Sequence, residues 1–217
     1  MGIINSAMAH STAMVLYYKQ LFYRVIMSKI NVAEIMSQKF ALELNGALAM
    51  ENAGMERLQT RIDETLLPEA KQQMQHHLQE SLVHQKRLQQ LITNIGGKPT
   101  EEKLGLPLPK FPQSMAEMMK NTMTKQEWEL KRSEEDLINE TAETICYQML
   151  IQKAQMAGGV FQNAIEPLSL NMKDEAKMAE WIRTNAPGMM AQLWPQIESA
   201  IASASSPASS QSPTQSQ

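Results

Sequence analysis

The sequence has little of several features, and each shortage excludes a class of protein. Cys146 is the only cysteine, so the chain forms no internal disulfide and no cysteine-based zinc site, and we expect a reducing, cytoplasmic environment. The formal net charge is only −3 at pH 7, which gives no strong field for holding nucleic acid. No glycine-rich phosphate loop and no nucleophile elbow occurs, so we expect no organic cofactor.

Long hydrophobic runs are also missing. The most apolar stretch, residues 13–26, is interrupted by Lys19, Gln20 and Arg24, so we expect no transmembrane segment. We interpret residues 1–30 as an N-terminal extension with two alternatives. It is an arm that packs on the protein or on a membrane surface, or it is not native and Met27 is the true start, which is the interpretation we favour.

Aromatic residues make up only 5% of the chain, whereas methionine is abundant at 18 residues and β-branched runs are few. This composition favours helix over sheet and predicts an all-α protein. Apolar residues recur at spacings of three, four or seven, which is typical of one helix face. They predict four long helices, over residues 31–67, 69–95, 124–157 and 160–184.

Helix-ending residues predict how these helices connect. Pro68 and the Gly158-Gly159 pair mark tight joins, so the first two helices and the last two run antiparallel. Thr124 with Glu127 predicts a capping box that opens the third helix. The long connection before it can span a whole helix, which leaves helices two and three parallel. We therefore predict a ferritin-like four-helix bundle with one long crossover between helices two and three.

The remaining boundaries follow from proline and from composition. We predict the bundle over residues 31–187 with a bend of its fourth helix at Pro167, and a separate short helix over 188–202. The Ser/Pro/Gln-rich residues 203–217 lack the apolar side chains needed to bury surface, so we predict a disordered tail.

Polar side chains lie on or beside the apolar stripes of all four predicted helices, at similar depths when counted from the tight joins. They are Glu51, Glu80, His84, Glu140, Glu143 and Glu175. Buried carboxylates need protons, partners or a metal, and oxygen-rich sites suit iron or manganese, although zinc accepts the same groups. The pattern predicts a site for one or two metal ions. His77 lies on the same face, but we interpret it as a packed or surface histidine.

Four short segments resemble the ferritin-like family of YciE/YciF type, whose members are stress-associated. The segments are Ala49-Met50-Glu51, His77-Leu78-Gln79-Glu80-Ser81 followed by Arg87-Leu88, Glu140-Thr141-Ala142-Glu143 followed by Tyr147, and Asp174 to Trp181. The resemblance implies a bundle that is often dimeric, here a homodimer, with a di-iron or related site. Val83 and Met178 stand where ferritin-like proteins usually carry a histidine, so a carboxylate-rich or vacant site stays open.

Two functions remain open from the sequence. The first is a metal-binding protein with oxygen or peroxide chemistry at a dinuclear carboxylate site, in which Tyr147 donates a hydrogen bond or packs. The alternative is a non-catalytic helical interaction or scaffold protein whose site holds no metal. The sequence does not decide whether the protein is an enzyme.

Overall fold

The computed structural model describes residues 18–20, 32–105 and 112–205, and all regular structure within them is helical. The elements are α2 (Val32–Glu64), α3 (Pro68–Asn94), α4 (Gln113–Thr122), α5 (Lys125–Ala157), the 3-10 helix η1 (Gly159–Ala164) and α6 (Ile165–Ser205). The predicted all-α class is confirmed. Apart from 18–20 and 203–205, the predictions for residues 1–30 and 203–217 lie outside the described residues.

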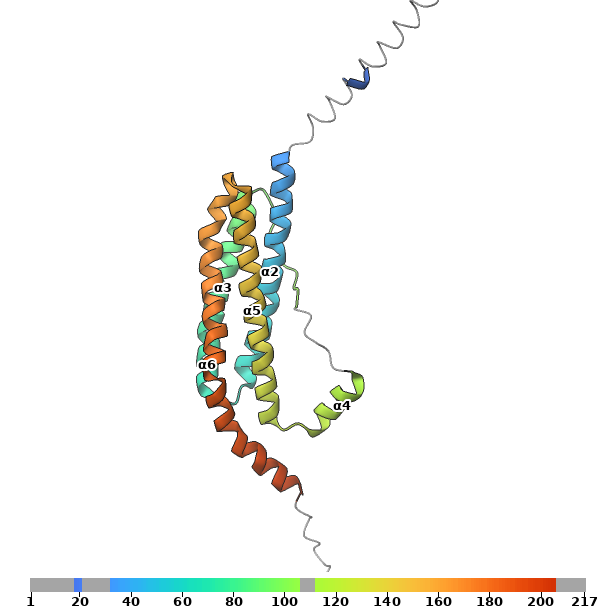
Figure 1. Cartoon of the computed structure of the whole chain (residues 1–217), viewed down its shortest axis with the longest axis vertical. Coiled ribbons are helices and arrows are strands. Elements are labelled where there is room, and N and C mark those ends of the chain that lie inside the picture. Colours follow the sequence, from blue (N-terminus) through green and yellow to red (C-terminus); the bar gives the residue numbers. More distant parts are fainter. Residues whose placement is uncertain (1–17, 21–31, 106–111, 206–217) are drawn as a thin grey trace, which may run out of the picture.

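The four long helices form a bundle with the predicted connectivity (Figure 1). Helix α2 packs on α3 and α5 packs on α6, while α3 meets α6 and α2 meets α5. The chain turns back after α2 and again after α5, whereas α3 ends at the top of the bundle and α5 begins at the bottom (Figure 1). Helices α3 and α5 therefore run parallel, and the long crossover is confirmed.

Local chemistry sets the helix ends. After α3, Gly96 has a φ of 82°, and the amides of Gly96 and Gly97 donate to the carbonyls of Thr93 and Ile92. This is a Schellman arrangement, which a residue without Cβ adopts without strain. At the start of α5, the Thr124 hydroxyl accepts from the Glu127 amide, and the Glu127 carboxylate accepts from the Thr124 amide. The predicted capping box is confirmed.

The crossover is tied to α2 by hydrogen bonds at successive levels. The Asn45 side-chain amide donates to the carbonyl of Lys98 at 3.1 Å, and its oxygen accepts from the Thr100 amide at 2.7 Å. Further along, the Leu104 amide donates to the Ala49 carbonyl at 2.8 Å. These bonds satisfy the backbone of an irregular segment and hold it along the bundle.

Two apolar clusters lie at opposite ends of the bundle. The upper cluster in Figure 1 includes Leu44, Leu88 and Leu168, and the lower cluster includes Ile62, Met74 and Ile182. Glu51 of α2, His77, Ser81 and His84 of α3, Glu140 and Glu143 of α5 and Glu175 of α6 are buried and lie between these two clusters in sequence, whereas the buried Arg61 and Glu129 lie at the level of the lower cluster. The bundle therefore consists of two apolar cores with a polar layer between them.

The last helix differs from the prediction in two ways. The α-helix begins only at Ile165, so Pro167 lies in its first turn, where a missing amide costs no helical hydrogen bond. The predicted separate helix over 188–202 is wrong, because α6 continues through Pro187 and Pro195. Met189 and Leu193 are buried in the lower cluster, and this packing outweighs the lost hydrogen bond at Pro187. Figure 1 shows this dark red end of α6 turning beneath the bundle.

In the part of the chain that the structure describes, no helix combines the length and apolarity required to cross a bilayer.

Candidate metal centre

Side chains from all four long helices converge in the polar layer. Helix α2 contributes Glu51, α3 contributes His77 and His84, α5 contributes Glu140 and α6 contributes Glu175. The two histidines are seven residues apart, which places them on one face of α3, two turns from each other. We call these five residues the Glu/His cluster.

The first half of the cluster brings together Glu51, His84 and Glu175, whose ligand-type atoms lie within 4.8 Å of one another. The Nδ1 atom of His84 is 3.2 Å from Glu51 Oε1 and 2.8 Å from Glu175 Oε1. All three side chains are buried, at 3% exposure or less. One imidazole nitrogen and two carboxylates therefore face a common point.

The second half brings together His77, Glu140 and Glu175, again within 4.8 Å. The Nε2 atom of His77 is 2.9 Å from Glu140 Oε2 and 3.2 Å from Glu175 Oε2. Glu175 thus belongs to both halves, and each of its oxygens faces a different histidine. A carboxylate in this position is the type that bridges two metal ions.

Several carboxylate oxygens of the cluster lack hydrogen-bond partners. Glu140 Oε2 and both oxygens of Glu175 are buried without one among the described residues. The ring nitrogens lie within ion-pair distance of these atoms, but the angles do not make hydrogen bonds. Buried charged oxygens without donors are costly and rare, and a bound cation is one way to satisfy them.

The outward nitrogen of each histidine faces a further carboxylate. His77 Nδ1 is 3.1 Å from Glu80 Oε2, and His84 Nε2 is 3.4 Å from Asp174 Oδ2. In metal sites, such a partner fixes the tautomer and the orientation of a ligating imidazole. Glu80 and Asp174 therefore lie where they can orient the two rings.

Tyr147 closes the cluster on the side of the upper core. Its hydroxyl donates a short hydrogen bond to Glu51 Oε1 and accepts from the side-chain amide of Asn171 at 3.1 Å. Arg87 in turn donates to Asn171 Oδ1 at 2.9 Å. This chain of contacts fixes the orientation of Glu51, and the predicted hydrogen bond from Tyr147 is present.

Contacts within the cluster raise the pKa values of both histidines. Burial alone would lower the pKa of His84, but contacts with Glu175 and Glu51 outweigh burial and raise it to about 10. For His77, burial is outweighed in the same way by Glu140, Glu175 and Glu80, and its pKa lies well above the usual range. Without a metal, the two rings are therefore protonated at neutral pH.

The carboxylates divide into one ionised group and three that hold protons more tightly. Burial would raise the pKa of Glu175, but His77 and His84 hold it below its usual range. Burial raises the pKa of Glu140 to about 8 despite His77, and burial with the charge of Glu175 raises that of Glu51. The pKa of Glu143 lies well above its usual range because of burial and the neighbouring charges of Glu175 and Glu51.

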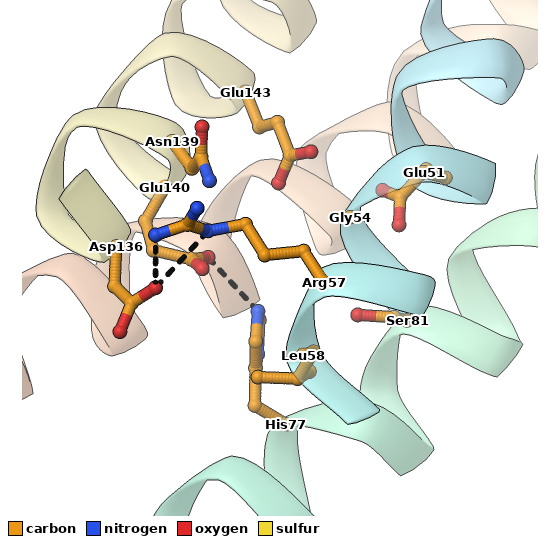
Figure 2. Close-up of a pocket in the computed structure, with 10 residues that line it drawn as sticks. All are labelled: Glu51, Gly54, Arg57, Leu58, His77, Ser81, Asp136, Asn139, Glu140 and Glu143. Atoms are coloured by element: carbon orange, nitrogen blue, oxygen red, sulfur yellow. Dashed lines mark hydrogen bonds and ion pairs between the residues drawn. The ribbon is translucent and has the colours of Figure 1, made fainter. Parts of the chain in front are cut away.

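A small cavity opens beside the cluster between α2 and α5 (Figure 2). Its volume is about 20 Å³, enough for about one water molecule or ion. Glu51, His77, Glu140 and Glu143 are among its lining residues. Figure 2 shows Glu143 reaching from α5 toward α2 above the Arg57 side chain.

The structure brings together four of the six predicted residues: Glu51, His84, Glu140 and Glu175. Glu80 instead contacts His77, and Glu143 lies at the cavity beside the cluster. Sequence reasoning missed His77, although its spacing of seven from His84 was a usable signal. Asp174 was also missed as a partner of His84, because it precedes Glu175 and only the packing of α6 on α3 shows the contact.

Comparisons with known proteins agree on the fold. The sequence pattern of a family described as a domain of unknown function (DUF892) matches residues 36–193. The crystal structure of a protein from Xanthomonas campestris pv. campestris has a TM-score of 0.60 with this chain at 16% sequence identity, covering 75% of this chain and 99% of that one. At this identity the likeness shows the fold alone. No curated protein matches the chain significantly.

Proposed function

Since this chain belongs to the DUF892 family, which is ferritin-like in type, we propose that its Glu/His cluster is a dinuclear metal site. The observation that carries this proposal is the placement of Glu175. Its two oxygens face two separate buried clusters, each completed by one histidine and one further glutamate. Glu51 and His84 would hold one ion, His77 and Glu140 would hold the other, and Glu175 would be the ligand common to both.

The geometry and chemistry of these residues suit a pair of metal ions. Three buried carboxylate oxygens lack hydrogen-bond donors, and the ligand set of imidazole nitrogens and carboxylate oxygens suits iron, manganese or zinc. Glu80 and Asp174 orient the histidine rings from outside. We favour iron or manganese because the cluster is rich in carboxylates, which are hard ligands.

When bound, iron or manganese would supply redox chemistry toward oxygen or peroxide, which is the class of reaction we propose. The residues around the site prepare it for that chemistry. Tyr147 and Asn171 fix the carboxylate of Glu51, and the Tyr147 hydroxyl places a proton beside the cluster. The apolar cores above and below exclude water from the polar layer.

Metal stoichiometry tests the proposal. We expect protein purified without chelators and loaded with Mn²⁺ to bind two ions per chain, one for each half of the cluster. Replacing the shared ligand in Glu175→Gln should abolish tight binding of both ions, whereas His77→Ala and His84→Ala should each abolish one. Inductively coupled plasma mass spectrometry after gel filtration measures these values.

The matched control is Glu180→Gln on the same helix. Glu180 is exposed, and its partners among the described residues are Arg183 and Thr184, so its removal should leave both ions bound. Circular dichroism verifies that each variant is folded before metal is added. Equal, substoichiometric metal in the parent and in Glu175→Gln would end the proposal.

The alternative is a scaffold protein in which protons take the place of the metal. One observation favours it: the raised pKa values of His77 and His84 give Glu175 two positively charged neighbours without any ion. A metal ion that binds only the folded state raises the melting temperature, so removing it with a chelator would lower that temperature. In a scaffold protein without metal, a chelator leaves the melting temperature unchanged. Thermal unfolding with and without chelator separates the two functions.

Three properties implied by the sequence stay predictions: the homodimer, the cytoplasmic location and the association with stress that marks the YciE/YciF type. The apolar residues exposed on α5 are compatible with a second copy; they include Ile138, Ile145 and Met149. Sedimentation or light scattering of the purified protein measures the oligomeric state.

A further inference from the structure

A second, larger cavity lies outside the small one, between α2, α5 and the crossover. Its volume is about 140 Å³, and Leu104 and Gly105 of the crossover, both exposed, form its outer edge. Met50 and Ala53 of α2 add an apolar wall. This cavity reaches the surface, whereas the small one reaches the Glu/His cluster.

The two cavities share the residues that separate them, which are Gly54, Arg57, Asn139 and Glu143. Because they share these residues, the two cavities adjoin between the surface and the cluster. Figure 2 shows these residues around the gap between α2 and α5. The side chains of Arg57 and Glu143 are therefore the groups that a small solute meets on the way in.

Glu143 is suited to receive a cation here. Its side chain is 8% exposed, and it makes no hydrogen bond or ion pair with the described part of the chain. It has room because Gly54 has no side chain: a Cβ at that position would lie 3.2 Å from Glu143 Oε1. A buried carboxyl group that has no partner among the described residues and borders a cavity is placed where it can bind a cation.

The charges beside the route also favour a cation. Arg57 is the positive group at the separating wall, and it pairs with Asp136 at 2.8 Å and with Glu135 at 3.4 Å. Arg61 shares Asp136 and also pairs with Glu129, so the three carboxylates of this group outnumber its two arginines. With its positive charge offset, Arg57 does not oppose a cation that approaches Glu143.

We propose that the opening between α2 and α5 is the route by which divalent cations reach the Glu/His cluster, with Glu143 as a transfer ligand on the way. The inference rests on the proposed metal site, and it assigns Glu143 a role in the rate of loading rather than in final binding. Gly54 keeps the passage open beside the Glu143 carboxylate. Arg57, tied to α5, limits its width.

Loading kinetics test this role with Co²⁺ as the probe, because its ligand-field absorption reports binding directly. Metal-free protein is mixed with Co²⁺ in a stopped-flow instrument, and the final stoichiometry is measured separately. We expect Glu143→Gln to load about tenfold more slowly, because a glutamine amide cannot exchange a proton for a cation as a carboxyl group can, and to reach the same final stoichiometry as the parent.

A matched pair of glycine variants on α2 gives a second test. Gly54→Ala introduces the Cβ that meets Glu143 and should slow loading, whereas Gly46→Ala meets nothing within 4 Å and should load at the parental rate. Both substitutions make the same change in helix propensity, so the difference between them isolates the passage.

The outcomes separate the two proposals. A parent protein that binds no Co²⁺ overturns the metal site itself. Full stoichiometry with unchanged rates in both Glu143→Gln and Gly54→Ala overturns the access route alone. Loss of one bound ion in Glu143→Gln also overturns the inference, because Glu143 would then be a permanent ligand. If Glu143→Gln does not fold, the comparison of Gly54→Ala with Gly46→Ala decides.

Discussion

The bundle contains two buried groups of charged side chains, and they differ in how their oxygens are satisfied. In the first, which we call the arginine network, Arg57 and Arg61 of α2 pair with Glu129 and Asp136 of α5. Both oxygens of Glu129 and both of Asp136 accept hydrogen bonds from Arg57, Arg61, Thr65 or the Leu66 amide. In the Glu/His cluster, three oxygens accept none.

This difference separates a structural group from a binding site. The arginine network is closed by protein donors, with only the Arg61 Nη1 atom left without a partner among the described residues. In the Glu/His cluster, His84 Nδ1 forms a hydrogen bond with Glu51 Oε1, but the ring nitrogens near Glu140 Oε2 and the two oxygens of Glu175 are not in hydrogen-bonding geometry. Buried polar atoms without hydrogen-bond partners are rare in folded proteins, and in the Glu/His cluster the proposed metal ions would satisfy them.

Breaking the arginine network should give the largest effect. Arg61→Met leaves the buried carboxylates of Glu129 and Asp136 without their main donor, and we expect a loss of about 3–5 kcal/mol in the free energy of unfolding. Urea denaturation measures it. The control Arg132→Met removes an ion pair with Glu64 that is over one-third exposed, and it should cost at most about 1 kcal/mol. Similar losses in the two variants would contradict the structural role.

Removing metal should lower the stability of the protein only when the Glu/His cluster is intact. At a free Mn²⁺ concentration about 100 times the dissociation constant, a bound ion should stabilise the folded protein by about 2.7 kcal/mol, because the ion binds the folded state. A chelator should remove this stabilisation in the parent and in Arg61→Met, but have nothing to remove in Glu175→Gln. Denaturation with and without chelator measures it, and a chelator effect in Glu175→Gln would argue against the shared ligand.

Weakening the support of one histidine should have a moderate effect. Glu80→Gln removes the charge that faces His77 Nδ1, and we expect metal affinity to fall by about 10-fold to 100-fold in the half that contains His77. Isothermal titration calorimetry measures it, with the exposed Glu69→Gln at the start of α3 as the control. Unchanged affinity would show that the ring needs no such partner.

Acid should weaken the arginine network through Glu129. Burial would raise the pKa of Glu129, but Arg61 and Thr65 outweigh burial and lower it from its ordinary value of 4.5. The unfolded chain then binds the proton more readily than the folded one, so this stabilisation is present above pH 4.5 and is lost as the pH falls through the lower folded value. We expect Glu129→Gln to be less stable at neutral pH and to lose less stability on acidification. An identical pH dependence in both proteins would contradict this.

Much of the fold follows from the sequence because helix faces and helix ends depend on local chemistry. The spacing of Leu44, Leu48 and Ile62 identifies the buried face of α2, and Thr124 with Glu127 identifies the start of α5. The continuation of α6 past Pro187 could not be predicted, since it depends on Met189 and Leu193 finding the lower core.

The sequence predicted the depth of the candidate site along the bundle to within about one helix turn. Its depth followed from counting residues, and four of the six predicted residues meet. The helix face alone did not decide between His77 and Glu80, because residues three apart share a face; the spacing of seven from His84 favoured His77, and the packing confirms that it points inward. The raised pKa of His84 likewise depends on Glu175, which lies on another helix.

The continuity of α6 has a practical consequence for anyone who shortens this protein. A version that stops at 187 removes Met189, Leu193 and Ile197, which are buried at 7%, 1% and 3% exposure. It would expose apolar residues of the lower cluster, such as Ile62 and Met74, to solvent, and exposed apolar surface promotes aggregation. A shortened chain that keeps these apolar residues buried has to extend past Ile197.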